Sequence, residues 1–234
     1  MKIIRKSLLV AAAVIGITSA TVPGHAESDD AVFILGGTRG TGLEIVRQLE
    51  TKGRSVTVLV RESSNLEGLK QTSASLVTGD ALDKASIDRA MATGRFSAAI
   101  STLSGTEAGG YVVDSIGNIN GIKAAGEAGI ERFILISSIG VGDSEGALPP
   151  AVVKALEITF REKGKAEDYL VESGLNFTIV RPGGLTNKGA SGKGILIEDP
   201  TAGGIISRAE LARLIVASLE DESTDRKTLA AVER

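Results

Sequence analysis

Residues 31–49, AVFILGGTRGTGLEIVRQL, constrain the fold of this chain more than any other stretch. Residues 31–35 form a short apolar run with β-branched and aromatic members, which is typical of a buried parallel strand. Gly36, Gly40 and Gly42 follow, and the apolar residues after them recur on one face of a helix. The stretch therefore predicts the strand, turn and first helix of a βαβ unit.

The glycines of this turn predict a phosphate site. Glycine permits a tight turn, lets a backbone approach a pyrophosphate closely, and lets the helix pack against its strand. The free amides and the positive dipole at the start of the helix favour a phosphate. We therefore expect a dinucleotide-binding fold, although a glycine-rich turn by itself could be only a tight connection.

The rest of the chain alternates apolar strand patterns with helical patterns. Strands are expected at residues 55–60, 74–78, 97–102, 132–137, 176–180 and 228–232, and helices at 83–93, 112–129, 151–173 and 206–219. This alternation predicts a single α/β domain, a Rossmann-like doubly wound parallel sheet with helices on both faces. Ser207 is expected to cap the last helix, with Glu210 as the acid of a capping box.

Residues 1–26 have the pattern of a secretory signal peptide. Lys2, Arg5 and Lys6 precede a mostly apolar stretch, and Gly24 and Ala26 supply small residues for cleavage. We expect a folded domain at residues 27–234, exported to the periplasm or secreted, with no membrane insertion after cleavage. An uncleaved membrane anchor and an ordinary N-terminal helix of a cytoplasmic protein remain alternatives.

Composition excludes several kinds of chemistry. The chain has no cysteine, and its only histidine, His25, lies in the predicted leader. Disulfides, thiol nucleophiles, Ser-His-Asp hydrolases and the usual zinc sites are therefore not expected, and no metal is predicted. A net charge of -3 and 3% aromatic residues argue against nucleic-acid binding. The expected partner is a small-molecule substrate, and the sequence does not predict an oligomeric state.

The end of the second predicted strand indicates which nicotinamide cofactor binds. An acidic side chain at this place bonds a ribose 2′-hydroxyl, whereas an arginine accommodates a 2′-phosphate. The chain has Arg61 there, with the hydroxyls of Ser63 and Ser64 close behind and Arg39 in the glycine turn. These residues favour NADP over NAD. The alternative is that Arg61 is simply a solvated arginine at a strand end.

Several segments together resemble the short-chain dehydrogenase/reductase superfamily over residues 31–234. The turn at residues 36–42 matches its Gly-xxx-Gly-x-Gly pattern, and residues 76–80 are similar to its adenine-contacting segment, with Asp80 as the acid. Residues 133–138 resemble the strand that delivers the catalytic serine, here Ser138. Arg181, Pro182 and Gly183 resemble the segment beside the nicotinamide, and residues 206–212 the start of a late helix.

The chain is most similar to the atypical branch that includes NmrA-like proteins and flavin or biliverdin reductases, because it departs from the Tyr-xxx-Lys motif. Lys165 stands where the lysine is expected, but Arg161 takes the place of the tyrosine. Lys165 is either a ribose ligand or a solvated lysine. Tyr169 is either a substitute acid or a packing residue. Ser138 and Asp80 have structural alternatives as well, as a strand end and a turn former.

The residue pattern and the resemblance together predict one site. The expected catalytic residues are Ser138 and Lys165. The expected cofactor-binding residues are Gly36, Thr38, Arg39, Gly40, Thr41, Gly42, Arg61, Ser63, Asp80, Ser101, Lys165, Arg181, Pro182 and Gly183. The substrate pocket is expected among the loops at residues 103–111, 139–150 and 183–204.

The leading functional hypothesis is an NADPH-dependent oxidoreductase that passes a hydride to a flavin, a quinone or a similar conjugated acceptor. Such an acceptor can take its proton from solvent, so the missing tyrosine matters less. A non-catalytic NADP(H) sensor or partner subunit is the alternative. A nucleotide-sugar epimerase or dehydratase is a weaker one, because that chemistry normally uses the tyrosine.

Overall fold

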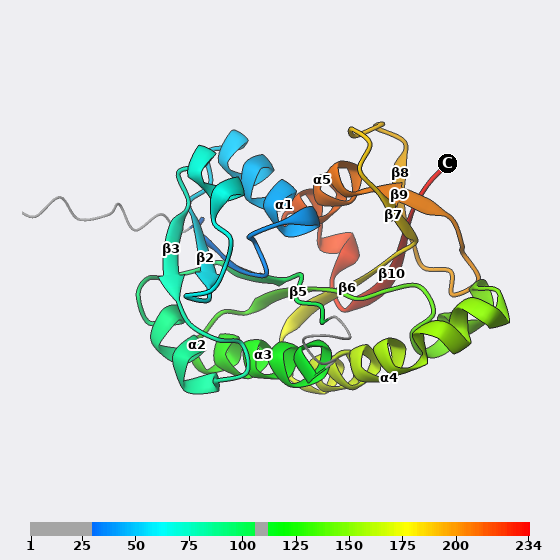
Figure 1. Ribbon diagram of the computed structural model, residues 1–234, viewed down its shortest axis with the longest axis horizontal. Coiled ribbons are helices and arrows are strands. Elements are labelled where there is room, and N and C mark those ends of the chain that lie inside the picture. Colours follow the sequence, from blue (N-terminus) through cyan, green and yellow to red (C-terminus); the bar gives the residue numbers. More distant parts are fainter. Residues whose placement is uncertain (1–29, 106–111) are drawn as a thin grey trace, which may run out of the picture.

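A computed structural model describes residues 30–105 and 112–234 (Figure 1). The predicted signal peptide and residues 106–111 of a predicted pocket loop lie outside the described residues. The main sheet has eight strands, in the order β3 (Ser75–Thr78), β2 (Val56–Val60), β1 (Val32–Leu35), β4 (Ala98–Ser101), β5 (Arg132–Ile136), β6 (Asn176–Pro182), β10 (Lys227–Glu233) and β8 (Gly194–Ile197). All neighbours pair in parallel except β10 and β8.

Helices cover both faces of this sheet. In Figure 1, α1 (Gly40–Thr51) and α5 (Arg208–Ser218) lie on one side, and α2 (Lys84–Met91), α3 (Asn118–Glu127) and α4 (Pro150–Glu172) lie on the other. The predicted doubly wound α/β fold is confirmed.

The two largest apolar layers of the core lie on opposite faces of the sheet. Along β1, Val32 and Ile34 pack into the layer under α1 and α5, whereas Phe33 and Leu35 pack into the layer against α2, α3 and α4. All four side chains are fully buried. Because successive side chains of a strand point to opposite faces, a strand covered on both sides must be apolar throughout. This burial fixes the strand end from which the glycine turn leaves.

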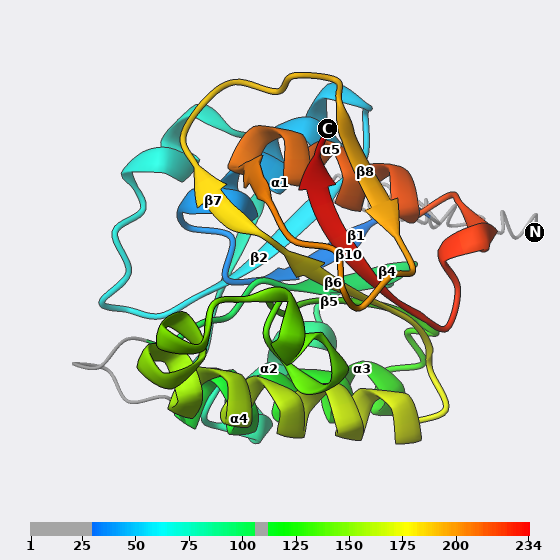
Figure 2. The same cartoon turned by 90° about the vertical axis from the view of Figure 1, so that its right-hand side faces the viewer.

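The C-terminal third contains three short strands that the sequence analysis missed. The apolar residues 195–197 belong to β8, which pairs antiparallel with β10 so that Ile195 lies opposite Val232. β7 (Gly184–Thr186) and β9 (Ile205–Ser207) form a separate two-stranded parallel sheet. Figure 2 shows β7 and β8 on the side of α1 and α5, opposite α4. These strands place residues 183–207 near the carboxyl ends of the main sheet.

The start of α5 confirms one half of the predicted cap and contradicts the other. Ser207 is the N-cap, and its Oγ accepts the Glu210 amide at 3.1 Å. The Glu210 carboxylate does not return to the Ser207 amide, which donates to Glu233 Oε1 at 3.0 Å. Glu210 is buried and accepts the amides of Gly192 and Gly194 at 2.9 and 2.7 Å. The capping-box assignment of Glu210 is therefore wrong, because the segment leading into β8 takes its carboxylate.

Within residues 30–105 and 112–234, no helix combines the length and the apolar character needed to cross a bilayer.

Candidate cofactor-binding site

A cleft of about 790 Å³ lies at the carboxyl ends of the central strands. The predicted site residues that line it are Gly36, Thr38, Arg39, Gly40, Thr41, Gly42, Arg61, Asp80, Ser138, Pro182 and Gly183. The structure thus brings together residues from one end of the sequence to the other. Ser63, Ser101, Lys165 and Arg181 are not part of this lining.

The glycine turn at the floor of the cleft leaves no room for side chains. A Cβ on Gly42 would lie 2.2 Å from the Gly36 carbonyl oxygen and 2.7 Å from Thr102 Oγ1. Gly36 and Gly40 have φ angles of +89° and +55°, which favour glycine. The N-cap residue of α1, Arg39, makes no side-chain cap hydrogen bond. The first amides of α1 are therefore left to solvent or to a ligand, and this cradle fits a dinucleotide pyrophosphate.

Two arginines lie at the end of the cleft next to β2. Arg61 follows β2, and its amide donates to Ser64 Oγ at 3.0 Å. Arg61, Arg39 and Ser64 all line the cleft, so Ser64 is the one of the two expected serines that lies there. In the described part of the chain, neither arginine forms an ion pair with a carboxylate. Two uncompensated guanidinium groups beside a hydroxyl make a suitable environment for a phosphate.

Asp80 is a turn former at the edge of the cleft. Its Oδ1 accepts the Leu82 amide at 2.9 Å, which makes it a turn former. Asp80 also lines the cleft.

Ser101 and Arg181 have structural partners outside the cleft. Ser101 is fully buried and its Oγ donates to Asn118 Oδ1 at 2.5 Å. The Arg181 guanidinium binds both Glu167 oxygens, at 3.1 and 2.7 Å, and also contacts Asp143. These contacts engage the polar atoms that were expected to face a cofactor.

The lysine that reaches the cleft is Lys163. Lys165 is exposed and its Nζ contacts both Glu162 oxygens, at 2.7 and 2.9 Å. Two residues correspond to a rotation of about 200° on a helix, so Lys165 points away from the face that Lys163 occupies. Thr159, four residues before Lys163, also lines the cleft. The helical face thus places a Thr-xxx-Lys pair where the Tyr-xxx-Lys motif was expected with Arg161 and Lys165.

The sequence carries a signal for Lys163 that the motif comparison overlooked. The buried residues of α4 are Phe160, Lys163, Ala166, Glu167 and Leu170. Their spacing of three and four residues marks one helical face. Lys163 lies on the same face as Phe160 and Leu170, and Lys165 does not.

Lys163 is held by a buried carboxylate. Its Nζ lies 2.9 Å from Asp114 Oδ1, and the Asp114 side chain is completely buried. The other oxygen, Oδ2, accepts the Gly105 amide at 2.9 Å. Asp114 belongs to a π-helical turn, η3 (Val113–Gly117), that precedes α3. Such turns are frequent at functional sites.

A second contact joins η3 to α4. Ser115 Oγ donates to Glu162 Oε2 at 2.8 Å. The Lys165 ammonium, followed by this hydroxyl, lowers the pKa of Glu162 to about 2. Glu162 therefore stays ionised at neutral pH, and its contact with Ser115 joins α4 to η3 one residue before Lys163.

The two serines after β5 differ in their hydrogen bonding. Both line the cleft. Ser138 Oγ donates to the Ile139 carbonyl at 2.9 Å. Ser137 is 5% exposed, and its Oγ has no hydrogen-bond partner among the described residues. A buried hydroxyl without a partner is unusual, which makes Ser137 the candidate ligand contact that sequence reasoning missed.

Tyr169 does not line the cleft. It packs against the core layer that contains Phe33 and Leu170. Lys123 Nζ lies 5.3 Å from the centre of its ring. Its place on α4 matches the packing interpretation rather than that of a substitute acid.

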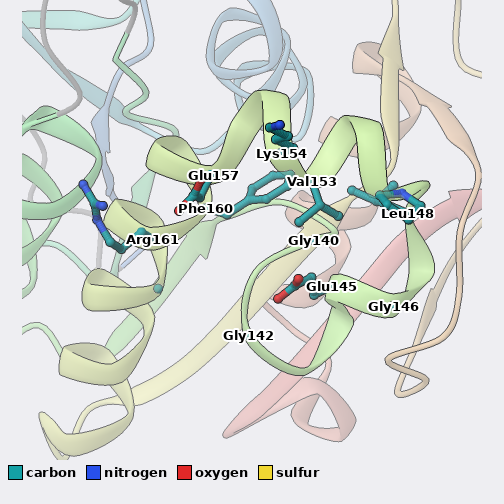
Figure 3. A pocket seen from close by; sticks show the side chains of 12 residues that line it. Gly140, Gly142, Glu145, Gly146, Leu148, Val153, Lys154, Glu157, Phe160 and Arg161 are labelled. Carbon is teal, nitrogen blue, oxygen red and sulfur yellow. The ribbon is translucent and has the colours of Figure 1, made fainter.

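A second cavity of about 940 Å³ adjoins the cleft (Figure 3). It lies between α4 and the loop that carries the 3₁₀ turn η4 (Gly142–Ala147). Leu148, Val153 and Phe160 supply apolar walls, and Phe160 also lines the first cleft. This cavity is built by the loop at residues 139–150, one of the three in which the substrate pocket was expected. The described residues contain no group of three or more carboxylate, histidine or cysteine side chains that could hold a metal ion.

A family model described as NAD(P)H-binding matches residues 36–222 of the chain. The chain belongs to this NAD(P)H-binding family. The resemblance to Rossmann-type short-chain reductases is thereby confirmed at the level of the family.

Relatives come from bacteria and plants. The chain is 34% identical over 215 residues to the uncharacterised chloroplastic protein At2g34460 of Arabidopsis thaliana, covering 87% of this chain and 76% of that protein. It is 30% identical to the uncharacterised sugar epimerase YhfK of Bacillus subtilis, covering 86% of this chain and 94% of that protein. Among solved structures it is similar to ChuY, an anaerobillin reductase from Escherichia coli O157:H7, with 29% identity, a TM-score of 0.77, and coverage of 87% and 97%.

Proposed function

We propose that this protein is an NADPH-dependent reductase that transfers a hydride to a conjugated ring acceptor. The observation that carries the proposal is the composition of one cleft, which combines the glycine cradle at Gly42 with a threonine, Thr159, four residues before Lys163. The first feature is suited to a dinucleotide. The second means that a threonine stands at the position where a ketone reductase would have the phenol that serves as its acid.

Different residues of the cleft would contact different parts of an extended dinucleotide. The glycine turn would hold the pyrophosphate. Arg39, Arg61 and Ser64 would hold the 2′-phosphate that distinguishes NADPH from NADH. At the other end, Lys163 would bind the nicotinamide ribose, with Pro182 and Gly183 beside the ring. When bound, a reduced nicotinamide supplies the hydride.

The residues around the reaction site favour an acceptor with delocalised electrons. Reduction of a simple ketone produces an alkoxide that needs a positioned acid, and in the described cleft the nearest equivalent is the Thr159 hydroxyl. A conjugated ring spreads the negative charge and takes its proton from water. Leu156 and Leu185 line the cleft and are exposed, and with Phe160 they offer apolar contact to a flat ring. The reductase among the similar structures supports the same reaction class.

A non-catalytic NADP(H) sensor is the second candidate, because Thr159 is compatible with binding without turnover. A sugar epimerase is a further alternative, because the Bacillus subtilis relative is named as one. That alternative is less well supported, since a threonine hydroxyl is a much weaker acid than a phenol and does not ionise near neutral pH to act as a base.

The test is to mix the purified full chain with NADPH and follow its absorbance with a panel of flavins, quinones and linear tetrapyrroles, and with an aliphatic ketone. We expect oxidation by at least one conjugated acceptor and none by the ketone. Gly42→Ala is the matched control for binding, since its Cβ would meet the Gly36 carbonyl at 2.2 Å. NADPH binding without oxidation by any acceptor would favour the sensor.

The leader at residues 1–26 also remains a proposal, with export as its consequence. The chloroplastic Arabidopsis thaliana relative, as its name describes it, is consistent with a targeting sequence in this family. N-terminal sequencing of the mature protein should give a chain that begins at Glu27. A chain that begins at Met1 would contradict cleavage.

A further inference from the structure

Arg208 reaches the cleft from the opposite end of the sequence. It is the first residue of α5, and it lines the cleft together with the glycine turn. A Cβ on Gly40 would lie 3.6 Å from Arg208 Nε and 3.7 Å from Cδ. The guanidinium therefore lies directly over the turn at the start of α1.

The position of Arg208 is fixed by contacts between the two helices. Gln48 of α1 donates through Nε2 to the Ala209 carbonyl at 2.9 Å. The apolar faces of α1 and α5 pack in one core layer, where Ile45 and Leu49 meet Leu211 and Ile215. These contacts hold the start of α5 against α1, and the Arg208 side chain extends from there to Gly40.

The described side-chain hydrogen bond of Arg208 is made with a neutral group. Its Nη1 donates to the neutral Asn187 Oδ1 at 2.7 Å. Among the described residues, no carboxylate forms an ion pair with it. A cation that loses part of its hydration is stabilised by an anion at hydrogen-bond distance. Here the group that is lacking is an anion beside Gly40, where the helix amides already favour one.

We infer that Arg208 binds the pyrophosphate of the dinucleotide, through the guanidinium that lies over Gly40. The inference rests on the proposed cofactor site. Arg208 would supply a full positive charge to the two phosphates, which the backbone amides of the glycine turn cannot supply. Because Asn187 follows β7 (Gly184–Thr186), the same guanidinium joins the loop after β7 to the bound phosphates. Arg39 and Arg61 are left for the 2′-phosphate.

Three ligands separate these roles in a calorimetric titration. NADPH has both the pyrophosphate and the 2′-phosphate, NADH has only the pyrophosphate, and adenosine 2′-monophosphate has only the 2′-phosphate. For Arg208→Gln we expect the Kd of NADPH and of NADH to rise by a similar factor of about ten or more, as for loss of a charge-assisted hydrogen bond. The Kd of adenosine 2′-monophosphate should change less than about twofold.

Controls separate loss of the charge from loss of the fold. Arg47→Gln removes an exposed arginine of α1 that pairs with Glu44, and it should leave all three affinities unchanged. Asn187→Ala releases the guanidinium without removing it and should keep NADPH affinity. If Arg208→Gln does not fold, as judged by circular dichroism, Arg208→Lys should retain the charge, lose the forked geometry, and weaken NADPH and NADH equally.

Two results would overturn the inference while leaving the proposed function intact. One is unchanged binding of NADPH and NADH by folded Arg208 variants. The other is an equal loss of affinity for adenosine 2′-monophosphate, which would place Arg208 at the adenosine end of the cofactor. If the wild-type chain bound neither NADPH nor NADH, the proposed function and the role of Arg208 would both be wrong.

Discussion

Lys163 and Asp114 form an ion pair in the wall of the cleft, with Nζ 2.9 Å from Oδ1 and side-chain exposures of 9% and 0%. The pair joins α4 to η3, and through the Gly105 amide it also fixes the loop that leaves β4. It fixes Lys163, the only lysine of the described cleft lining, at the position that we propose for the nicotinamide ribose.

Asp114→Asn is expected to destabilise the protein strongly. The substitution leaves a buried ammonium without its counter-charge, a change that costs about 3 to 5 kcal/mol in folded proteins. Urea denaturation would measure the loss in the free energy of unfolding. Lys165→Met, which breaks the exposed pair with Glu162, should cost less than about 1 kcal/mol. A loss below about 1 kcal/mol for Asp114→Asn as well would show that the buried pair is not structurally important.

Arg61→Asp should weaken the binding of NADPH more than the binding of NADH. The substitution replaces a cation at the end of β2 with an anion, which repels a 2′-phosphate and can bond a 2′-hydroxyl. We expect the ratio of the two dissociation constants, measured by calorimetry, to change by about tenfold or more in favour of NADH. Equal losses for both cofactors would contradict the assignment of Arg61 to the 2′-phosphate.

Ser137→Ala and Ser138→Ala distinguish the two serines of the cleft. Ser137 Oγ is buried without a partner among the described residues, so its removal should not lower the free energy of unfolding, because no hydrogen bond is lost. The kcat/KM for the best acceptor should fall by about tenfold, as expected for one lost hydrogen bond to the ligand. Ser138 is already bonded to the Ile139 carbonyl, and its removal should have the smaller kinetic effect. The reverse order would support the serine that the sequence motif indicates.

Glu210→Gln should reveal a pH-dependent contribution to stability. The Arg213 guanidinium, with the amides of Gly192 and Gly194, lowers the pKa of Glu210 from 4.5 to about 2. A lowered native pKa stabilises the fold above the unfolded value, and this contribution is lost as pH falls toward the native value. We expect the free energy of unfolding of the wild type to exceed that of Glu210→Gln by about 2 kcal/mol at pH 7.

That difference should shrink between about pH 5 and pH 2, as measured by denaturant unfolding across this range. Glu44→Gln on the surface of α1 serves as the control and should change stability by less than about 1 kcal/mol at pH 7. A difference for Glu210→Gln that stays constant down to pH 2 would contradict the role of its charge.

The sequence was sufficient for the middle strands of the central sheet because they are buried on both faces. Strands such as β1 then carry continuous apolar runs, and a glycine turn between such a strand and a helix is typical of a dinucleotide-binding unit. β7, β8 and β9 were missed for the opposite reason. They are three or four residues long and begin at or next to a glycine, so each gives only a weak apolar signal, the longest at residues 195–197.

Side-chain partners from distant parts of the chain account for the remaining differences at the site. Arg181 fits a nicotinamide-side motif, but Glu167 and Asp143 bind it. Lys163 was overlooked because the motif was aligned two residues late, although the apolar spacing of α4 identifies the correct face. Arg208 could not be assigned at all, since only the packing of α5 on α1 brings it over Gly40.

The most direct test of the proposed cofactor site is calorimetric titration of the purified wild-type chain with NADPH and NADH. The chain has no tryptophan, so heat is a more suitable signal than quenching of protein fluorescence. We predict one NADPH per chain, with NADH bound more weakly. Absence of heat-producing binding for both cofactors, in a chain shown to be folded, would contradict the central claim that this cleft is an NADP(H) site.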